Sequence, residues 1–157
     1  MSVTVFIPAR YASSRYPGKP LVDLTGATGR KASLIQRSWE AAQGIPGVDD
    51  VYVLTDDDRI ADATRAFGGA VLMTSSAARN GTERCAEGLA QLDTAPEIIV
   101  NLQGDAPLTP AWFLEALIAH MQANPDAQMA TPVLRTDAET LENFVTDRKE
   151  GRVGGTT

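Results

Sequence analysis

The sequence is poor in the residues from which disulfide and zinc sites are built. Its 157 residues include one cysteine, Cys85, and one histidine, His120. A single cysteine excludes a disulfide framework and a multi-cysteine zinc site, and a single histidine excludes a site with two histidine ligands. Aromatic residues make up only 6% of the chain, whereas hydrophobic residues make up 43%. That content is typical of a globular protein, and the length predicts one domain.

Long apolar runs and an excess of positive charge are also missing. No apolar segment approaches the ~18 residues that a membrane-spanning helix requires. The N-terminal segment MSVTVFIPAR lacks the basic region of a secretory signal, so we expect a cytoplasmic protein with no membrane partner. Fourteen Lys and Arg residues against twenty Asp and Glu residues give a net charge of -6. Such an acidic chain disfavours a nucleic acid as the partner.

Short apolar segments alternate with amphipathic segments along the chain. The expected strands are residues 3–7, 51–54, 70–73, 97–102 and 128–135, the last placed at a sheet edge because it contains Pro132. The expected helices are residues 33–43, 57–67, 81–92, a segment from an N-cap at Thr109 to Met121, and a short last helix capped by Thr136 and Glu139. Because the strands are almost continuously apolar, this order predicts a mostly parallel sheet with helices on both faces, a three-layer α/β/α fold.

A basic loop follows the first predicted strand. Arg10, Arg15 and Lys19 lie within ten residues there, with Ser13 and Ser14 between them. Ligands of parallel α/β sheets bind at the carboxyl ends of strands, and such a cluster of cations suits a polyphosphate. The alternative interpretation is a solvated basic loop. The loop contains no G-x-G-x-x-G pattern, so a dinucleotide fingerprint is absent.

A carboxylate follows the fourth predicted strand. Asp105 comes directly after Gly104 in the segment NLQGDAP. Mg²⁺ in proteins binds one or two carboxylates together with substrate phosphates, which makes Asp105 a candidate metal ligand opposite the basic loop. The alternative is a turn aspartate, since Gly-Asp-x-Pro is favourable turn chemistry. The acidic run 56–58 favours a helix cap over a metal cluster, and Cys85 and His120 are interpreted as a core residue and a helix-end surface residue.

Three segments together resemble the 3-deoxy-manno-octulosonate (Kdo) cytidylyltransferase, or CMP-Kdo synthetase, family. IPARYASSRYPGKPL is similar to the N-terminal signature of that family, NGTER (80–84) to its S-G-T-[DE]-R segment, and VNLQGDAP (100–107) to its V-N-[VL]-Q-G-D-E-P segment. The segments follow the family's order at similar spacing, and the likeness covers nearly all of the chain. The resemblance implies a Rossmann-type fold like that of nucleotide-diphospho-sugar transferases.

The same resemblance implies an activity and a set of site residues. The implied enzyme transfers CMP from CTP to Kdo or a similar sugar acid, releases pyrophosphate, uses Mg²⁺, serves lipopolysaccharide biosynthesis and is a homodimer at full length. The implied catalytic residues are Arg10, Lys19 and Asp105, with Asp105 as the metal ligand. The implied nucleotide-binding residues are Arg10, Ser13, Arg15, Lys19, Asn80, Gly81, Thr82 and Arg84, and Gln103 is the implied sugar-binding residue.

The chain departs from the family pattern in three places and in length. Residues 26–32 form a longer turn, the segment 75–79 lacks an Asp-His pair, and Ala106 replaces a glutamate. Because family members are longer, we expect residues 1–157 to be a single nucleotide-binding α/β domain and the N-terminal part of a longer enzyme. Two alternatives remain: another sugar-acid nucleotidyltransferase of the same fold, and a short non-catalytic nucleotide-binding module.

Overall fold

A four-stranded parallel sheet forms the centre of the protein. In a computed structural model of the chain, residues 1–12, 16–133 and 135–149 are described. The strands lie in the order β5-β4-β1-β6, and their bounds are Val3–Pro8 (β1), Asp50–Thr55 (β4), Ala70–Met73 (β5) and Ile98–Asn101 (β6). Val5 of β1 pairs with Val51 of β4 on one side and with Val100 of β6 on the other. Four of the five expected strands and their parallel arrangement are confirmed.

The predicted helices are all present, with small shifts at their ends. Their bounds are Leu34–Gln43 (α1), Asp58–Ala66 (α2), Gly81–Leu89 (α3), Ala111–Ala123 (α4) and Ala138–Lys149 (α5). The first three begin where a polar side chain accepts a hydrogen bond from a backbone N–H of the first turn: Ser33, Asp57 and Asn80. Such caps satisfy donors that the helix itself leaves without partners. The interpretation of the acidic run as a helix cap is therefore confirmed at Asp57.

The expected caps of the last two helices are wrong. The N-cap of α4 is Pro110, and the hydroxyl of Thr109 instead donates to the carbonyl oxygen of Ala106 at 3.0 Å. The Thr109 hydroxyl therefore stabilises the turn before α4 and does not cap the helix. At the start of α5 the carboxylate of Asp137, not the side chain of Thr136, accepts from the backbone N–H of Thr140 at 2.8 Å. An aspartate at that position also interacts favourably with the helix dipole.

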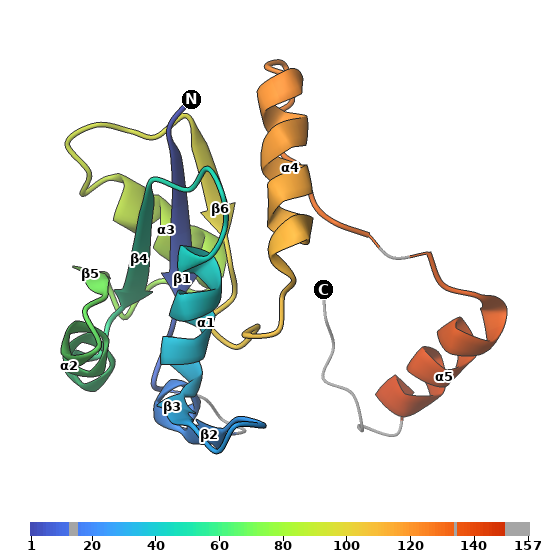
Figure 1. Ribbon diagram of the computed structural model, residues 1–157, viewed down its shortest axis with the longest axis horizontal. Helices are drawn as coiled ribbons and strands as arrows, with labels where there is room; N and C mark the ends of the chain where they lie inside the picture. Colours follow the sequence, from blue (N-terminus) through green and yellow to red (C-terminus); the bar gives the residue numbers. More distant parts are fainter. Residues whose placement is uncertain (13–15, 134, 150–157) are drawn as a thin grey trace.

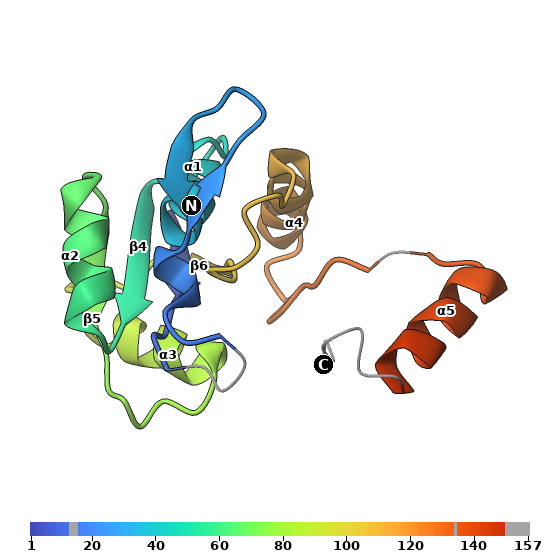
Figure 2. The ribbon, with the colours of Figure 1, turned by 90° about the horizontal axis from the view of Figure 1, so that it is seen from below.

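The two faces of β1 pack on different helices. Val5 and its like-facing neighbours contact Ile35 of α1, together with apolar side chains of α2 and α4. Phe6 points the other way, against Cys85 of α3, which is 7% exposed. Figures 1 and 2 show α1 and α3 on opposite sides of the sheet. The three-layer α/β/α fold and the core position of Cys85 are therefore confirmed.

A short β-hairpin precedes α1 and was not predicted. Its strands are β2 (Asp23–Thr25) and β3 (Lys31–Ser33), and a 3-10 turn, η1 (Lys19–Leu21), comes before them. The longer turn at residues 26–32 therefore forms the tip of the hairpin and most of β3. The guanidinium of Arg37 on α1 donates to the carbonyl oxygens of Leu24 and Arg30, each at 2.8 Å. This arginine fastens the hairpin to the helix.

The expected fifth strand, residues 128–135, is wrong. Its described residues, 128–133 and 135, form no strand, and Met129 and Val133 are each 85% exposed. An apolar run becomes a strand only where a neighbouring strand offers hydrogen-bonding partners, and this segment leads away from the sheet toward α5 (Figures 1 and 2). His120 is exposed in the last turn of α4, as expected. Within the described residues, every helix is too short or too polar to cross a bilayer.

Candidate functional site

The strand order defines where a ligand site belongs. From β1 the chain builds the sheet outward through β4 and β5, and it then returns to the other side of β1 to form β6. The topological switch point is therefore between β1 and β6. Ligands of open parallel sheets bind at the carboxyl ends of the strands at such a point. The two segments that leave the sheet there are the loop after Pro8 and the loop after Asn101, and these are the loops that carry the predicted phosphate and metal residues.

The loop after β1 is held by its own backbone and by an aromatic ring. The backbone N–H of Ala9 donates to the carbonyl oxygen of Leu54 at 2.8 Å, and Gly18 N–H donates to that of Tyr11 at 2.9 Å. Gly18 has a φ of +72°, and a side chain there would meet the Tyr11 ring at 3.0 Å. The Arg59 guanidinium carbon lies 3.3 Å from the centroid of that ring. The Tyr11 ring thus ties the loop to α2 by a cation–π contact.

Lys19 and Asp105 form the central ion pair of the site. The ammonium of Lys19, at the start of η1, donates to Asp105 Oδ2 at 2.6 Å. The two side chains are 48% and 54% exposed. The pair therefore lies at the mouth of the switch point, where either partner is accessible to a ligand. Arg10 is exposed in the loop after β1, whereas Ser13 and Arg15 lie outside the described residues.

The backbone at Gly104 sets the position of Asp105. The buried hydroxyl of Ser38 on α1 donates to the carbonyl oxygen of Gly104 at 2.8 Å. A Cβ atom at Gly104 would lie 2.9 Å from the carbonyl oxygen of Pro8, a distance that real side chains do not tolerate. Glycine is needed here because the loops after β1 and β6 approach so closely. Ser38 was not predicted; the signal for it is a lone hydroxyl on an otherwise apolar helix face.

The N-terminus of α3 touches the end of β1 and the loop after β6. Asn80 Oδ1 accepts from the backbone N–H of Glu83 at 2.9 Å and caps the helix. A Cβ atom at Gly81 would lie 3.1 Å from Pro8 Cγ and 3.4 Å from Gln103 Nε2. The first turn of α3 therefore lies against the chain just after β6 and the end of β1. Gln103 Nε2 also donates to Asn101 Oδ1 at 3.1 Å.

Arg84 is placed differently from the other predicted nucleotide residues. It is 4% exposed, and its guanidinium lies 3.1 Å from Asp56 Oδ1 and donates to the hydroxyl of Thr74. Asp56 and Thr74 directly follow β4 and β5. Neither partner was predicted. The sequence signal for them is their position directly after a strand, at the sheet edge where the nucleotide residues were expected.

Local ion pairs lower the pKa values of two carboxylates near the site. The side chain of Arg59 holds the pKa of Asp57 below its ordinary value, and the side chain of Arg79 does the same for Glu83. Both acids lie at helix N-termini and stay ionised in neutral solution. Among residues 1–12, 16–133 and 135–149, no three His, Cys, Asp or Glu side chains cluster as a ready metal cage. A metal ion bound by Asp105 would therefore need further ligands from a bound substrate.

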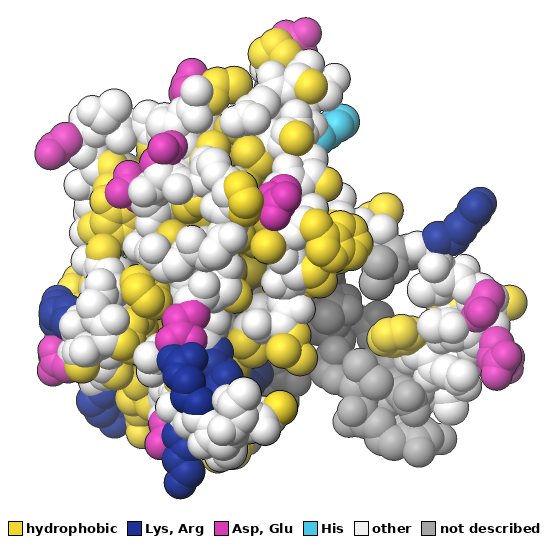
Figure 3. Space-filling model, viewed as in Figure 1, with side chains coloured by type: hydrophobic (Ala, Val, Ile, Leu, Met, Phe, Trp, Pro, Cys, Tyr) yellow, Lys and Arg dark blue, Asp and Glu magenta, His cyan; other side chains and the backbone are white. Residues whose placement is uncertain are grey.

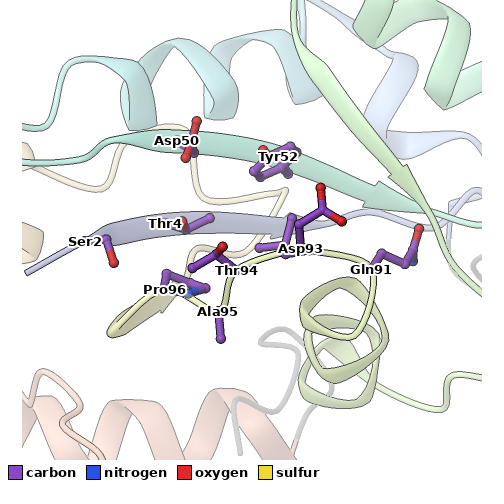
Figure 4. A pocket seen from close by; sticks show the side chains of 10 residues that line it. Ser2, Thr4, Asp50, Tyr52, Gln91, Asp93, Thr94, Ala95 and Pro96 are labelled. Carbon is purple, nitrogen blue, oxygen red and sulfur yellow. The ribbon is translucent and has the colours of Figure 1, made fainter.

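Two depressions are lined by residues other than Lys19 and Asp105. One, of about 400 Å³, is formed at the amino ends of β1 and β4 by residues that include Ser2, Asp50 and Asp93 (Figure 4). Another, of about 510 Å³, lies between the β2–β3 hairpin, α1 and Leu108. On the face shown in Figure 3, Lys and Arg side chains gather at the lower end, where the strands of Figure 1 point. In the same view this end is formed by β2, β3 and α2, and Asp and Glu side chains lie among the basic ones.

Comparison with known proteins places this geometry in a family. The family described as cytidylyltransferase matches residues 4–149. A 3-deoxy-manno-octulosonate cytidylyltransferase from Maricaulis maris is 44% identical over 157 residues, which are 100% of this chain and 59% of that protein. An 8-amino-3,8-dideoxy-manno-octulosonate cytidylyltransferase from Shewanella piezotolerans is 46% identical over 126 residues, 80% of this chain and 49% of that protein.

A solved structure agrees with both the fold and the sequence match. It is the structure of CMP:2-keto-3-deoxy-manno-octonic acid synthetase complexed with CTP, with a TM-score of 0.73 and 39% identity over 80% of this chain and 49% of that chain. The present chain thus spans about half to three fifths of these proteins. The resemblance and the Rossmann-type fold that the sequence motifs implied are confirmed. The chain belongs to the cytidylyltransferase family.

Proposed function

We propose that this chain forms the nucleotide side of an enzyme that transfers CMP from CTP to Kdo or a closely similar sugar acid and releases pyrophosphate. The observation that carries the proposal is the Lys19–Asp105 pair, 2.6 Å apart at the switch point between β1 and β6. The proposal includes residues 1–157 as a single nucleotide-binding α/β domain. It also includes a cytoplasmic, homodimeric whole enzyme that serves lipopolysaccharide biosynthesis.

The basic loop is proposed to hold the triphosphate. Arg10 and Lys19 carry the accessible cations of its described part, and Ser13 and Arg15 belong to the same loop. Phosphate oxygens would replace the carboxylate of Asp105 as the partner of Lys19. In the reaction, the anomeric hydroxyl of the sugar attacks the α-phosphorus and the bond to pyrophosphate breaks. These cations then neutralise the charge on the departing pyrophosphate, a catalysis by positioning and electrostatics.

Asp105 is proposed to hold Mg²⁺. Its carboxylate supplies the oxygen ligands that Mg²⁺ prefers, and it is half exposed and already paired with a cation. This single carboxylate fits a metal ion whose other ligands are phosphates and water. When bound, Mg²⁺ would withdraw electron density from the phosphate and screen its charge. The part of Asp105 is to fix the position of that charge, with Gly104 and Ser38 holding its backbone.

The first turn of α3 and Gln103 are proposed to face the other two parts of the reactants. Asn80, Gly81 and Thr82 would line the cytidine side, because this turn lies beside both site loops. Gln103 would contact the sugar acid from the adjacent loop. The match to an 8-amino-3,8-dideoxy-manno-octulosonate cytidylyltransferase favours that amino sugar as a second candidate acceptor. Pyrophosphate release with a panel of Kdo, its 8-amino analogue and sialic acid distinguishes these acceptors.

Titration of the chain with CTP tests the nucleotide part of the proposal. We expect binding to require Mg²⁺, and Lys19→Met or Arg10→Met to weaken it, since a charge-assisted phosphate contact contributes about 1.5–3 kcal/mol, roughly tenfold or more in Kd. Lys31→Met is the matched control, because Lys31 is an exposed lysine on the β2–β3 hairpin. Calorimetry measures all four proteins.

Titration of Asp105→Asn with CTP, in Mg²⁺ and in EDTA, tests the proposed metal ligand. This variant should bind CTP in Mg²⁺ no better than in EDTA, because the amide removes the anionic ligand while keeping the shape. Equal Kd values for the wild type, Lys19→Met and Arg10→Met would show that the loop does not hold phosphate. A full Mg²⁺ response in Asp105→Asn would place the metal elsewhere.

A further inference from the structure

Arg84 is the only charged side chain that is buried within the described part of the chain, at 4% exposure. Burying a charge is costly unless an opposite charge and hydrogen bonds compensate it. Arg84 has both, from Asp56 at 3.1 Å and from the Thr74 hydroxyl. Thr74 is itself attached to β4, because its backbone N–H donates to the carbonyl oxygen of Thr55 at 2.8 Å. The guanidinium therefore joins α3 to the carboxyl ends of two strands.

The same helix meets the candidate site one turn earlier. Gly81 lies against Pro8 and Gln103, and the backbone N–H of Arg84 donates to the carbonyl oxygen of Asn80 at 3.2 Å. The anchor at Arg84 and the contact at Gly81 are thus parts of one rigid turn. A shift of the anchor would move Gly81 relative to both site loops.

We propose that Arg84 is a positioning residue of the nucleotide site and that it does not bind the nucleotide itself. Through its pair with Asp56 it fixes the first turn of α3 against Pro8 and Gln103. Its guanidinium is enclosed and already neutralised, so turning toward a ligand would leave Asp56 without its ion-pair partner. This role rests on the proposed CTP site, and it assigns a function to Asp56 as well.

The two possible roles of Arg84 predict different behaviour for Asp56. If Arg84 only positions α3, Asp56→Asn and Arg84→Met should weaken CTP binding alike, by roughly five- to tenfold, a typical size for coupling through a packed network. The double variant should bind CTP no more weakly than either single variant, because the two substitutions break the same Arg84–Asp56 interaction. If Arg84 binds CTP directly, Asp56→Asn leaves affinity unchanged or raises it, and only Arg84→Met lowers it. Calorimetry is done at a temperature where every variant is folded.

Hydrogen exchange provides a readout that does not depend on CTP. Without nucleotide, amides of residues 81–84 should exchange faster in Asp56→Asn and Arg84→Met than in the wild type, and Arg84→Lys should restore part of the protection by keeping the charge. Arg65→Met is the control, because Arg65 is an exposed arginine that pairs with Asp62 on the surface of α2. If Arg84→Met does not fold, exchange and CTP affinity are compared between Asp56→Asn and the wild type.

The outcomes separate this inference from the proposed function. Faster exchange together with weaker CTP binding in Asp56→Asn supports the positioning role. Unchanged amide exchange in Asp56→Asn overturns the positioning role. Faster exchange with unchanged CTP affinity also overturns it, because the pair would then contribute to stability alone. A wild type that does not bind CTP contradicts the proposed function, while faster exchange in the variants would still support Arg84 as the anchor of α3.

Discussion

In the Lys19–Asp105 pair, each side chain occupies the place of the other's proposed ligand. The carboxylate of Asp105 lies where a phosphate would bind Lys19, and the ammonium of Lys19 lies where a metal ion would bind Asp105. The ion pair neutralises both groups at the mouth of the switch point. Because both side chains are half exposed, water screens their attraction, and such pairs contribute little to stability. In the proposed site, exchange of these partners for a nucleotide and a metal would therefore cost little. An accessible, weakly held pair is what a binding site requires.

Cys85 shows the opposite situation, a titratable group enclosed in the core. Burial raises the pKa of its thiol from the usual 9.0 to about 11, and the nearby charge of Arg84 only partly opposes this. The thiol of the unfolded chain ionises near pH 9, whereas the folded protein keeps its proton up to about pH 11. Between these values unfolding releases a proton, so the free energy of unfolding falls as pH rises.

We therefore expect Cys85 to make the protein less stable in alkali. From pH 8 to pH 11 the free energy of unfolding should fall more in the wild type than in Cys85→Ala, as urea denaturation at each pH measures. Lysine and tyrosine side chains titrate in both proteins, so the difference between the two curves isolates the thiol. Parallel curves would show that the thiol ionises in the folded protein as it does in the unfolded chain.

At the scale of elements, the loops after β1 and β6 depend on a close backbone approach. Gly104 lies where a Cβ would come within 2.9 Å of the Pro8 carbonyl oxygen. Gly104→Ala should therefore separate the two loops, lower the free energy of unfolding by about 1–3 kcal/mol and weaken CTP binding. Thermal unfolding and calorimetry measure the two effects.

Gly44→Ala is the matched control for that change. Gly44 ends α1 with a φ of -81°, and its nearest neighbour, the carbonyl oxygen of Ala41, would be 3.7 Å from a new Cβ. Alanine fits there, so stability should stay the same or rise slightly. Equal effects at Gly44 and Gly104 would mean that loss of glycine, and not the approach of the two loops, is responsible.

At the scale of the whole molecule, the segment after α4 is unlike the rest. Large apolar side chains are exposed there, on α4 and just before it: Leu108, Trp112, Met129, Val133, Leu141, Phe144 and Val145. Figure 3 shows hydrophobic side chains along the side of the molecule formed by α4, and Figure 2 shows α5 apart from the sheet. The first four helices, by contrast, all contribute buried residues to the core.

The chain alone should be a poor synthetase. It spans 59% of the Maricaulis maris protein, and Asp105 is the single carboxylate that the described residues place at the β1–β6 switch point with a cation as partner. Precise positioning of an acceptor contributes several kcal/mol to catalysis, so we expect pyrophosphate release from CTP and Kdo to be at least roughly a hundredfold slower than in that protein. A coupled phosphate assay compares the two at equal concentration. Comparable rates would show that residues 1–157 hold a complete catalytic set.

The sequence by itself determined the order of strands and helices and the loops that carry the charged residues. Those features depend on local patterns: apolar runs in β1, β4 and β6, helical spacing of apolar residues in α1 and α4, and motifs whose spacing is visible along the chain. It could not determine residues 128–135, because a strand exists only if a partner edge is present. The β2–β3 hairpin was missed for a related reason, since each of its strands has only three residues.

Only the tertiary structure decided what the charged residues contact. Lys19 and Asp105 are 86 residues apart, and they meet because β1 and β6 are neighbours in the sheet. Arg84 belongs to the same motif as Asn80 and Gly81, yet its side chain is buried against Asp56. A motif fixes which residues occur together, whereas the direction of a helix face relative to the sheet fixes which of them reach a ligand. That direction is set by packing over the whole core, which no local pattern records.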